Sequence, residues 1–364
     1  RVARAVGLPP EPRRTHPLNR YPAGLPAGLL AKALGLGGGS FTLDAACASS
    51  LYALKLACDE LLSGRADAML AGGANRPDSQ YTQMGFAQLR ALSASGRCAP
   101  FDAAADGLMV GEGAGIFVLK RLTDALAHGD DIHAVICGAG LSNAMKVVLG
   151  LGHKVRPPQA NFASPAEGLR YAGGPFRVPT QAEPWDARRP TLPRRAAVSG
   201  FGFGGVNAHL LVEEYVGQTY FDGGKKSGPV VVPGARKADK PAEPAAEPVA
   251  VVGMAAHFGP WETLRQFQEH VLGGAARPAA SPDRPGWGPA DGPPPRGFYL
   301  NQLVARLDRF RVPPKELEEM LPQQLLMLTV AADALADCRG ATPAGESDPR
   351  AGVFVGLNLD LNTT

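Results

Sequence analysis

The stretch from Gly217 to Pro248 divides the 364-residue chain into two parts. Its second half repeats Pro, Ala, Lys and Glu, and such a composition buries too little apolar surface to order itself. We therefore expect a linker at residues 217–248, between a leading segment (residues 1–216) and a trailing segment (residues 249–364). A second stretch rich in Pro and Gly, from Ala275 to Gly297, predicts an extended surface loop.

The leading segment alternates strand and helix patterns. A short apolar run at residues 41–46 is predicted to end in a sharp turn, and leucines then recur at helical spacing until Gly64. Further strands are predicted at residues 66–72, 115–120 and 132–137. This alternation predicts an α/β fold with a mostly parallel sheet covered by helices.

The trailing segment repeats this kind of pattern on a shorter scale. It predicts a strand at residues 249–253, an amphipathic helix at residues 261–272, a longer helix from Pro322 and a last strand at residues 353–356. We interpret it as the opening of a second α/β domain.

Charge and cysteine content exclude several classes of protein. Lys and Arg number 37 against 34 Asp and Glu, without a basic stripe, so a nucleic-acid partner is disfavoured. No apolar run approaches the roughly 18 residues that span a bilayer. The five cysteines form no C-x-x-C pair, which argues against disulfides and a metal site and for the cytoplasm. Because the chain begins at Arg1 without a signal peptide, we expect an internal piece of a longer polypeptide.

The sharpest chemical signal is the run DAACASS at residues 44–50. It places Cys47 where a buried strand turns into a helix, among small residues that allow close approach. Unpaired N–H groups and the positive end of the helix dipole favour a thiolate there and can stabilise an oxyanion. The alternative interpretation is a small buried residue that opens a helix. The remaining cysteines lie in apolar or loop contexts, where we expect no catalytic role: Cys58, Cys98, Cys137 and Cys338.

A glycine-rich run, GFGFGGVNAH at residues 200–209, contains G-x-G-x-x-G. A dinucleotide site would need a helix after it, but residues 206–213 predict a strand. Glycines around two phenylalanines instead indicate a tight loop that holds an aromatic ring against an apolar channel. The glycines of residues 35–39 precede a strand and are interpreted as a turn, so neither run supports NAD.

Four segments in order, DAACASS, FDAAADGLMVGEGAG (residues 101–115), RPPQANF (residues 156–162) and GFGFGGVNAH, resemble the β-ketoacyl synthase family. VAVVGMAAHFGP at the start of the trailing segment resembles the start of another such domain, as do PPKELEEMLPQQLLML and GVFVGLNLDLNTT. The family's usual Asp-Pro-Gln-Gln-Arg is replaced by residues 321–325 (LPQQL), a variant associated with tandem condensing modules of polyunsaturated-fatty-acid and polyketide synthases.

The resemblance implies a thiolase-like αβαβα layered sandwich, as an incomplete copy followed by the start of a second copy. It makes Cys47 the catalytic nucleophile, with the backbone N–H groups of Cys47 and Phe203 as the oxyanion hole and the Phe203 ring as a gate. Phe201, Gly202, Phe203 and Gly204 would contact substrate. The resemblance implies no cofactor, substrates carried on the phosphopantetheine of an acyl carrier protein, and a homodimer.

Two family motifs that carry catalytic histidines, His-Gly-Thr-Gly-Thr and Lys-Ser-Asn-x-Gly-His, are absent. In the family a long segment with both motifs separates the equivalents of Asn143 and Ala144, so we expect an internal gap at 143/144. The histidines at positions 128, 133, 153 and 209 do not replace them convincingly. Without the two histidines, acylation of Cys47 remains possible, but malonyl decarboxylation should be severely impaired.

Three explanations compete for this incompleteness. The chain is an excerpt of a larger polypeptide with residues missing, or the product of a true deletion, or a permuted enzyme whose trailing segment packs on the leading one. We favour the first, because a deletion would remove central strands and expose apolar surface. We rank the third last, since it restores no histidine.

The sequence thus predicts a β-ketoacyl synthase fragment: residues 1–216 as the C-terminal part of one ketosynthase domain and residues 249–364 as the N-terminal part of a second. The expected reaction is decarboxylative Claisen condensation of an acyl thioester with malonyl-carrier protein. The alternative is a non-catalytic chain-length or assembly module. A cysteine hydrolase would need a paired His and acid that the sequence does not supply.

Overall fold

The computed structural model describes most of the chain outside the expected linker. The described residues are 25–76, 81–138, 144–169, 174–189, 192–217, 247–274, 279–282, 295–300, 302–318, 320–339 and 347–357. Residues 218–246 of the linker, Asn143 at the expected internal gap, and most of the loop expected at residues 275–297 lie outside this part.

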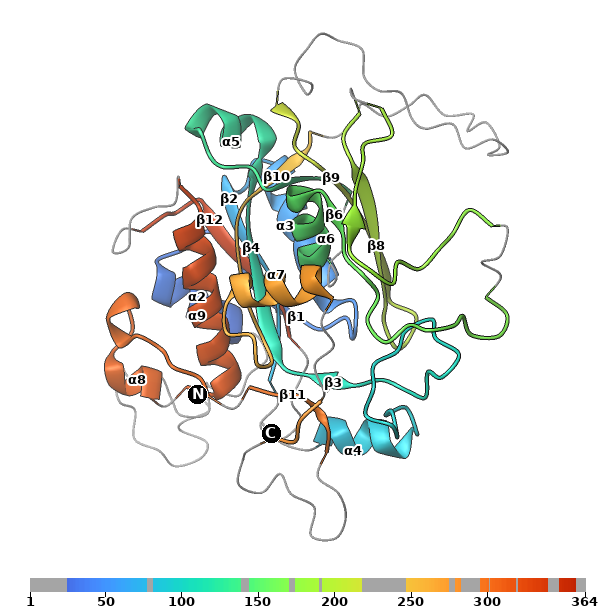
Figure 1. Ribbon diagram of the computed structural model, residues 1–364. Helices are drawn as coiled ribbons and strands as arrows, with labels where there is room; N and C mark the ends of the chain where they lie inside the picture. Colours follow the sequence, from blue (N-terminus) through green and yellow to red (C-terminus); the bar gives the residue numbers. More distant parts are fainter. Residues whose placement is uncertain are drawn as a thin grey trace.

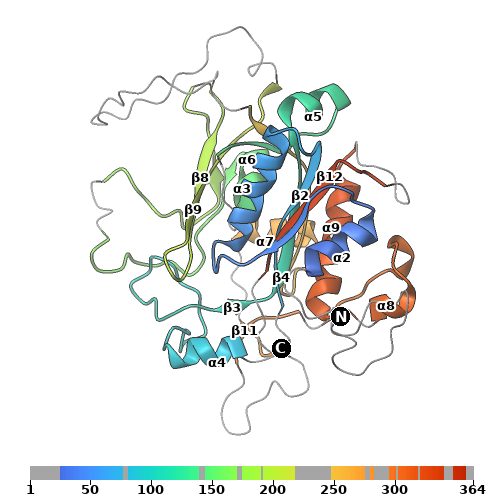
Figure 2. The ribbon, with the colours of Figure 1, turned by 180° about the vertical axis from the view of Figure 1, so that it is seen from behind.

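Within the described part, one eight-stranded sheet forms the centre of the molecule (Figures 1 and 2). Its strand order is β1-β12-β2-β4-β10-β5-β9-β8. These strands are β1 (Ser40–Leu43), β2 (Ala68–Asn75), β4 (Gly113–Arg121), β5 (Ala134–Gly138), β8 (Arg195–Phe201), β9 (Asn207–Glu213), β10 (Val249–Phe258) and β12 (Ala351–Leu357). Two short pairs lie outside it: β3 (Val110–Gly111) with β11 (Gly297–Phe298), and β6 (Val155–Arg156) with β7 (Glu183–Pro184).

Helices cover both faces of this sheet, so the expected α/β class is confirmed. They are α2 (Leu25–Leu34), α3 (Ser49–Leu62), α4 (Tyr81–Gln88), α5 (Leu122–His128), α6 (Ala144–His153), α7 (Leu264–Gly273), α8 (Pro314–Glu318) and α9 (Pro322–Asp337), with a 3-10 turn at Leu307–Arg309. Each strand and helix expected from the apolar pattern is present, with ends that differ by a few residues.

Two hydrophobic cores lie on opposite faces of the sheet. Side chains alternate along a strand, so Ile116 and Val118 of β4 join the core under α2 and α9, whereas Phe117 and Leu119 join the core under α3 and α6. The sheet curls, and its β8–β9 end closes over α3 from the other side: Leu210 of β9 belongs to the same core as α3. The first turn of α3 is thereby enclosed between two parts of one sheet.

The two strands of the trailing segment fill spaces between strands of the leading segment. The β1-α3-β2 crossover leaves room for one strand, which β12 occupies in parallel with both neighbours. The β4-α5-β5 crossover leaves another such space, which β10 occupies antiparallel to both neighbours. Every residue of β12 is buried, as is typical of a central strand covered on both faces.

This arrangement corrects two expectations. The sheet is not mostly parallel: β12 pairs in parallel with β1 and β2, whereas every other neighbouring pair in the described sheet is antiparallel. β4 and β5 do run in the same direction, as the alternating pattern predicts, but β10 lies between them and runs antiparallel to both. Joint packing of the two segments, ranked last from the sequence, is what the structure shows. That residues 249–364 derive from a second domain stays a prediction, since strand order does not report it.

A charged cluster also joins the two segments at one end of the sheet. Asp67 pairs with Arg350 of the trailing segment (Nη2 to Oδ1, 2.9 Å) and with Arg121 (Nη2 to Oδ1, 2.5 Å). Arg350 also donates to the carbonyl of Gly64 (2.7 Å). Hydrogen bonding from Arg350, assisted by Arg121, holds the pKa of Asp67 well below its usual range.

Replacing Asp67 by Asn should lower the free energy of unfolding by about 1 kcal/mol at pH 7, a modest value because the carboxylate is partly exposed. A depressed pKa stabilises the fold above the unfolded-state value of about 4, and this contribution is lost as the pH falls further. Urea unfolding of both proteins at pH 7 and pH 3 should therefore show the difference shrinking at pH 3. The matched control is Asp308→Asn, whose partner Arg306 lies in the same segment. Equal losses for both variants would contradict a role in joining the segments.

Candidate active site

Cys47 lies in a tight turn between β1 and α3, at the junction expected from the sequence. Ala46 has a positive φ of 51°, a conformation that few L residues adopt. Hydrogen bonds lock this turn: the Asp44 carboxylate accepts from the Ala46 N–H (2.8 Å), while the Ser49 hydroxyl accepts from the Ala45 N–H (2.8 Å) and donates to the Ala46 carbonyl (2.6 Å). Ala48, the N-cap residue of α3, makes no side-chain cap. The thiol therefore stands beside a helix N-terminus that no cap side chain covers.

This turn packs directly against the glycine backbone of two strands, β12 and β2. A Cβ atom at Gly356 of β12 would lie 2.5 Å from the Ser50 nitrogen, and one at Gly73 of β2 would lie 2.9 Å from the Ser50 Cβ. Both distances are too short for any side chain. The start of α3 thus packs directly on the sheet, and one of the strands that it contacts, β12, belongs to the trailing segment.

The glycine-rich loop approaches the same turn from the other side. Gly204 and Gly205 have φ values of 89° and 85°, which allow the tight connection from β8 to β9. A Cβ at Gly202 would lie 2.9 Å from the Ala45 carbonyl oxygen, and one at Gly200 would overlap the Leu51 Cδ1. The expected strand after this loop is present as β9, so the predicted tight loop between two strands is confirmed.

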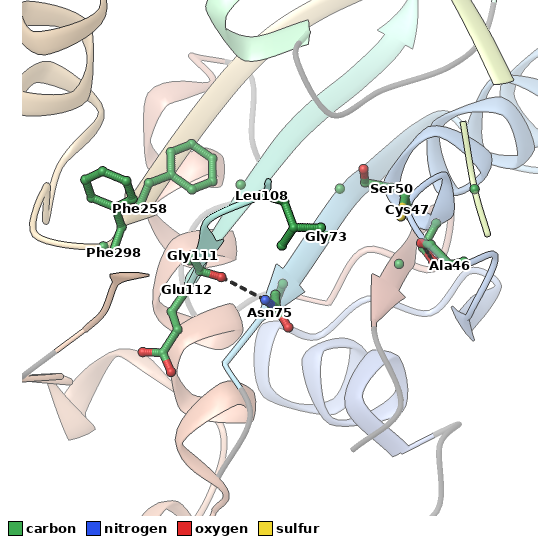
Figure 3. A pocket seen from close by; sticks show the side chains of 18 of the residues that line it. Ala46, Cys47, Ser50, Gly73, Asn75, Leu108, Gly111, Glu112, Phe258 and Phe298 are labelled. Atoms are coloured by element: carbon green, nitrogen blue, oxygen red, sulfur yellow. Dashed lines mark hydrogen bonds between the residues drawn. The ribbon is translucent and has the colours of Figure 1, made fainter. Parts of the chain in front are cut away.

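A cavity of about 1170 Å³ opens between these parts (Figure 3). Cys47, Phe201, Gly202 and Phe203 all line it, whereas Gly204 is not among its described lining residues. Cys47 is exposed, and Phe203 is 81% exposed. The structure therefore brings the predicted nucleophile and the predicted loop together at one cavity. The gating role of Phe203 stays a prediction.

Sequence reasoning missed one wall of the cavity. Phe258, Trp261 and Phe298 of the trailing segment line it together with Gly113 and Gly115 of β4. The signal was present in GEGAG: glycines two residues apart share one face of a strand, which leaves that face without side chains. What the sequence did not indicate was which rings would cover this face.

Another missed residue is Glu112, a buried carboxylate in the cavity lining. Its Oε2 accepts from the Leu300 N–H (2.9 Å), and its backbone N–H donates to the Phe298 carbonyl (2.8 Å). Glu112 thereby fixes the trailing segment against the cavity.

No histidine is among the described residues that line this cavity. The Nδ1 atom of His209 lies 2.8 Å from the Ser199 hydroxyl on the β8–β9 hairpin, and the Nε2 atom of His133 lies 3.0 Å from Asp337. His153 lines a smaller cavity, and His128 ends α5. None of these four histidines lies in the described lining of the cavity that holds Cys47.

The other cysteines lack the features of a nucleophile. Cys58 is buried inside α3, and burial raises the pKa of its thiol to about 12. Desolvation also raises the pKa of Cys98, and desolvation together with Glu213 raises the pKa of Cys137 to about 12. Cys338 is buried at the end of α9. In the described part of the chain, no three His, Cys, Asp or Glu side chains gather as metal ligands, and no helix has the length and apolarity to cross a membrane.

Comparison with known proteins gives consistent matches. The family model "Beta-ketoacyl synthase, N-terminal domain" matches residues 5–125 and 246–364. One subunit of the polyunsaturated fatty acid synthase of Thraustochytrium sp. is 29% identical over 429 residues, covering 92% of this chain and 20% of that protein. One subunit of the phenolphthiocerol/phthiocerol polyketide synthase of Mycobacterium tuberculosis is 31% identical over 274 residues, covering 51% of this chain and 18% of that protein.

Among solved structures, a PfaC keto synthase-chain length factor is 30% identical with a TM-score of 0.48, covering 71% of this chain and 35% of that one. The chain spans about a fifth of the length of the two synthase proteins. The 429 aligned positions of the Thraustochytrium protein exceed the 364 residues of this chain, so that protein carries residues that this chain lacks.

Brief treatment with iodoacetamide at pH 8 should modify Cys47 at least about tenfold faster than Cys58, Cys98 or Cys137, because Cys47 is exposed whereas desolvation raises the pKa of the other three thiols. Peptide mass spectrometry at several time points measures the rates. Equal labelling of Cys98 or Cys137 would argue against a special environment at Cys47.

Gly202→Ala should slow modification of Cys47 by an acyl epoxide about a hundredfold, because the added methyl group forces the loop away from the Ala45 carbonyl. Gly152→Ala is the matched control, since a Cβ there meets no atom within 4 Å. Intact-mass kinetics of the two variants check this expectation, and equal rates would show that close packing of the loop on the turn is dispensable.

Proposed function

Because this chain belongs to the β-ketoacyl synthase family, we propose that its cavity is the acyl-binding site of a condensing enzyme and that Cys47 accepts the acyl group. The curled sheet with helices on both faces is a thiolase-like α/β fold. The observation that carries the proposal is that an exposed thiol at a helix N-terminus and the glycine-rich loop line one large, mostly apolar cavity.

In the proposed acyl transfer, the Cys47 thiolate adds to the carbonyl carbon of a pantetheine thioester. The carbonyl oxygen becomes an oxyanion, which the backbone N–H groups of Cys47 and Phe203 would stabilise. The carbon–sulfur bond to pantetheine then breaks, and the departing thiolate takes up the proton that Cys47 released. The product is an acyl-Cys47 thioester and free pantetheine thiol.

The second half of the family reaction needs donors that stabilise the enolate formed when malonyl thioester loses carbon dioxide. The described cavity lining holds no histidine for this purpose. We therefore propose that the chain performs acyl transfer and that decarboxylation depends on residues it lacks. The same observation favours the second candidate, a non-catalytic chain-length or assembly module.

The proposed partners follow from the substrate. An acyl group small enough for the cavity would arrive on the phosphopantetheine of an acyl carrier protein, within a polyunsaturated-fatty-acid or polyketide synthase that acts as a homodimer. No further cofactor is required, because acyl transfer between thiols is balanced without a redox change.

Incubation with a short acyl-pantetheine should place one acyl group on Cys47, as measured by intact mass and peptide mapping. Cys47→Ala should reduce labelling by about three orders of magnitude, whereas the control Cys98→Ala, which removes another exposed thiol, should not change it. Malonyl-pantetheine should yield no measurable carbon dioxide. Absence of acylation in the wild-type chain would support the assembly module instead.

A further inference from the structure

A second cavity, of about 410 Å³, lies beside α6 and α7, which are neighbours in the fold (Figure 1). It shares no described lining residue with the cavity at Cys47. Its polar lining residues are His133 and His153 of the leading segment and Gln268 and Asp337 of the trailing segment, and we call it the α6–α7 cavity. Its volume is within the range of pockets that bind small organic molecules.

The inner part of the α6–α7 cavity is apolar. Val148 and Leu149 of α6 and Met254 of β10 line it, and all three are buried in the hydrophobic core. Gly152 and His153, at the end of α6, are exposed, so the cavity opens to solvent there. A ligand that fits this arrangement carries a short alkyl group inside and its polar group at the opening.

Asp337 supplies the one carboxylate of the described lining, which includes no Lys or Arg. Its Oδ2 accepts from the His133 Nε2 (3.0 Å) and from the Met254 N–H (3.0 Å). Burial raises the pKa of Asp337, but these two hydrogen bonds outweigh burial and the pKa is lowered overall. Arg339 is already paired with Asp131 (2.7 Å). The carboxylate at the cavity is therefore charged at neutral pH and favours a cationic ligand over an anionic one.

Three acceptors in this lining have no hydrogen-bond partner among the residues that the structure describes. Both bonds of Asp337 go to Oδ2, which leaves its Oδ1 available. The Gln268 amide and the His153 ring likewise bond to no described residue. An amide oxygen and a neutral imidazole each offer one acceptor, and a primary ammonium group has three N–H donors and one positive charge. A metal ion suits the cavity less, because no three side chains gather as metal ligands in the described part of the chain.

We propose that the α6–α7 cavity binds a small aliphatic primary amine in its ammonium form. The ammonium group lies at Asp337, Gln268 and His153, and the alkyl group lies between α6 and Met254. This site is independent of the proposed acyl transfer at Cys47. Because the leading and trailing segments each supply part of it, the bound amine also stabilises their joint packing.

Calorimetric titration of the full chain near neutral pH compares hexylamine with hexanol and hexanoate, which keep the alkyl group and change the head group. Hexylamine should bind at one site per chain with a Kd on the order of 1 mM, and hexanol at least about tenfold more weakly, because it lacks the charge and two of the donors. Hexanoate should bind more weakly still, since its charge repels the carboxylate. Equal binding of the amine and the alcohol, or no binding of the amine, overturns the proposal.

Two variants place the binding in the α6–α7 cavity. Asp337→Asn should weaken the binding of hexylamine at least about tenfold, because the neutral amide keeps the shape and loses the charge. The matched control is Asp333→Asn, one turn earlier on α9, whose partner is Arg309 and which does not line the cavity. It should leave the Kd unchanged.

Gln268→Leu is the second variant, since the Gln268 side chain bonds to no described residue and its replacement leaves the contacts of Asp337 intact. It should weaken hexylamine binding about fivefold, while thermal unfolding without the amine matches that of the unchanged chain. Hexylamine binding that neither Asp337→Asn nor Gln268→Leu weakens overturns the proposal, because the amine then binds elsewhere.

Discussion

The fold depends on the pairing of β10 and β12 inside the sheet of the leading segment. Without them, β2 and β4 would pair only with each other, and the inner edges of β1 and β5 would present unpaired backbone groups beside two hydrophobic cores. A buried N–H or carbonyl without a partner costs about as much as a lost hydrogen bond, and a whole strand edge multiplies that cost. The trailing segment is therefore part of the sheet, although the linker separates it in the sequence.

The candidate site also depends on β10 and β12. The turn that carries Cys47 packs on Gly356 of β12, and Phe258 of β10 lines the same cavity. Glycine backbone contacts the start of α3 and also the Phe258 ring, and these close contacts hold both parts of the cavity in place. Because glycine is the residue type that permits such close approach, the position of the turn that carries Cys47 depends on residues without side chains.

The features of the site bear differently on the two half-reactions of the family, acyl transfer and decarboxylation. The hydrogen bonds of Asp44 and Ser49 orient the turn around Cys47, and the glycine-rich loop packs closely against this turn. These features suit the proposed attack on a thioester. The described cavity lining holds no histidine, so our proposal assigns acyl transfer to this chain and leaves decarboxylation out.

Local patterns in the sequence determined the elements and the nucleophile candidate. Helical spacing defined α3, Gly64 ended it, and the run around Cys47 placed a thiol at a strand-to-helix turn, because these features depend on near neighbours. Strand order and direction were decided only by tertiary structure: β10 lies between β4 and β5, which run in the same direction, and it pairs antiparallel with both although they are more than a hundred positions away in the sequence. The aromatic lining of the cavity could not be predicted for the same reason: only the folded chain brings the Phe258 ring over Gly115 of β4.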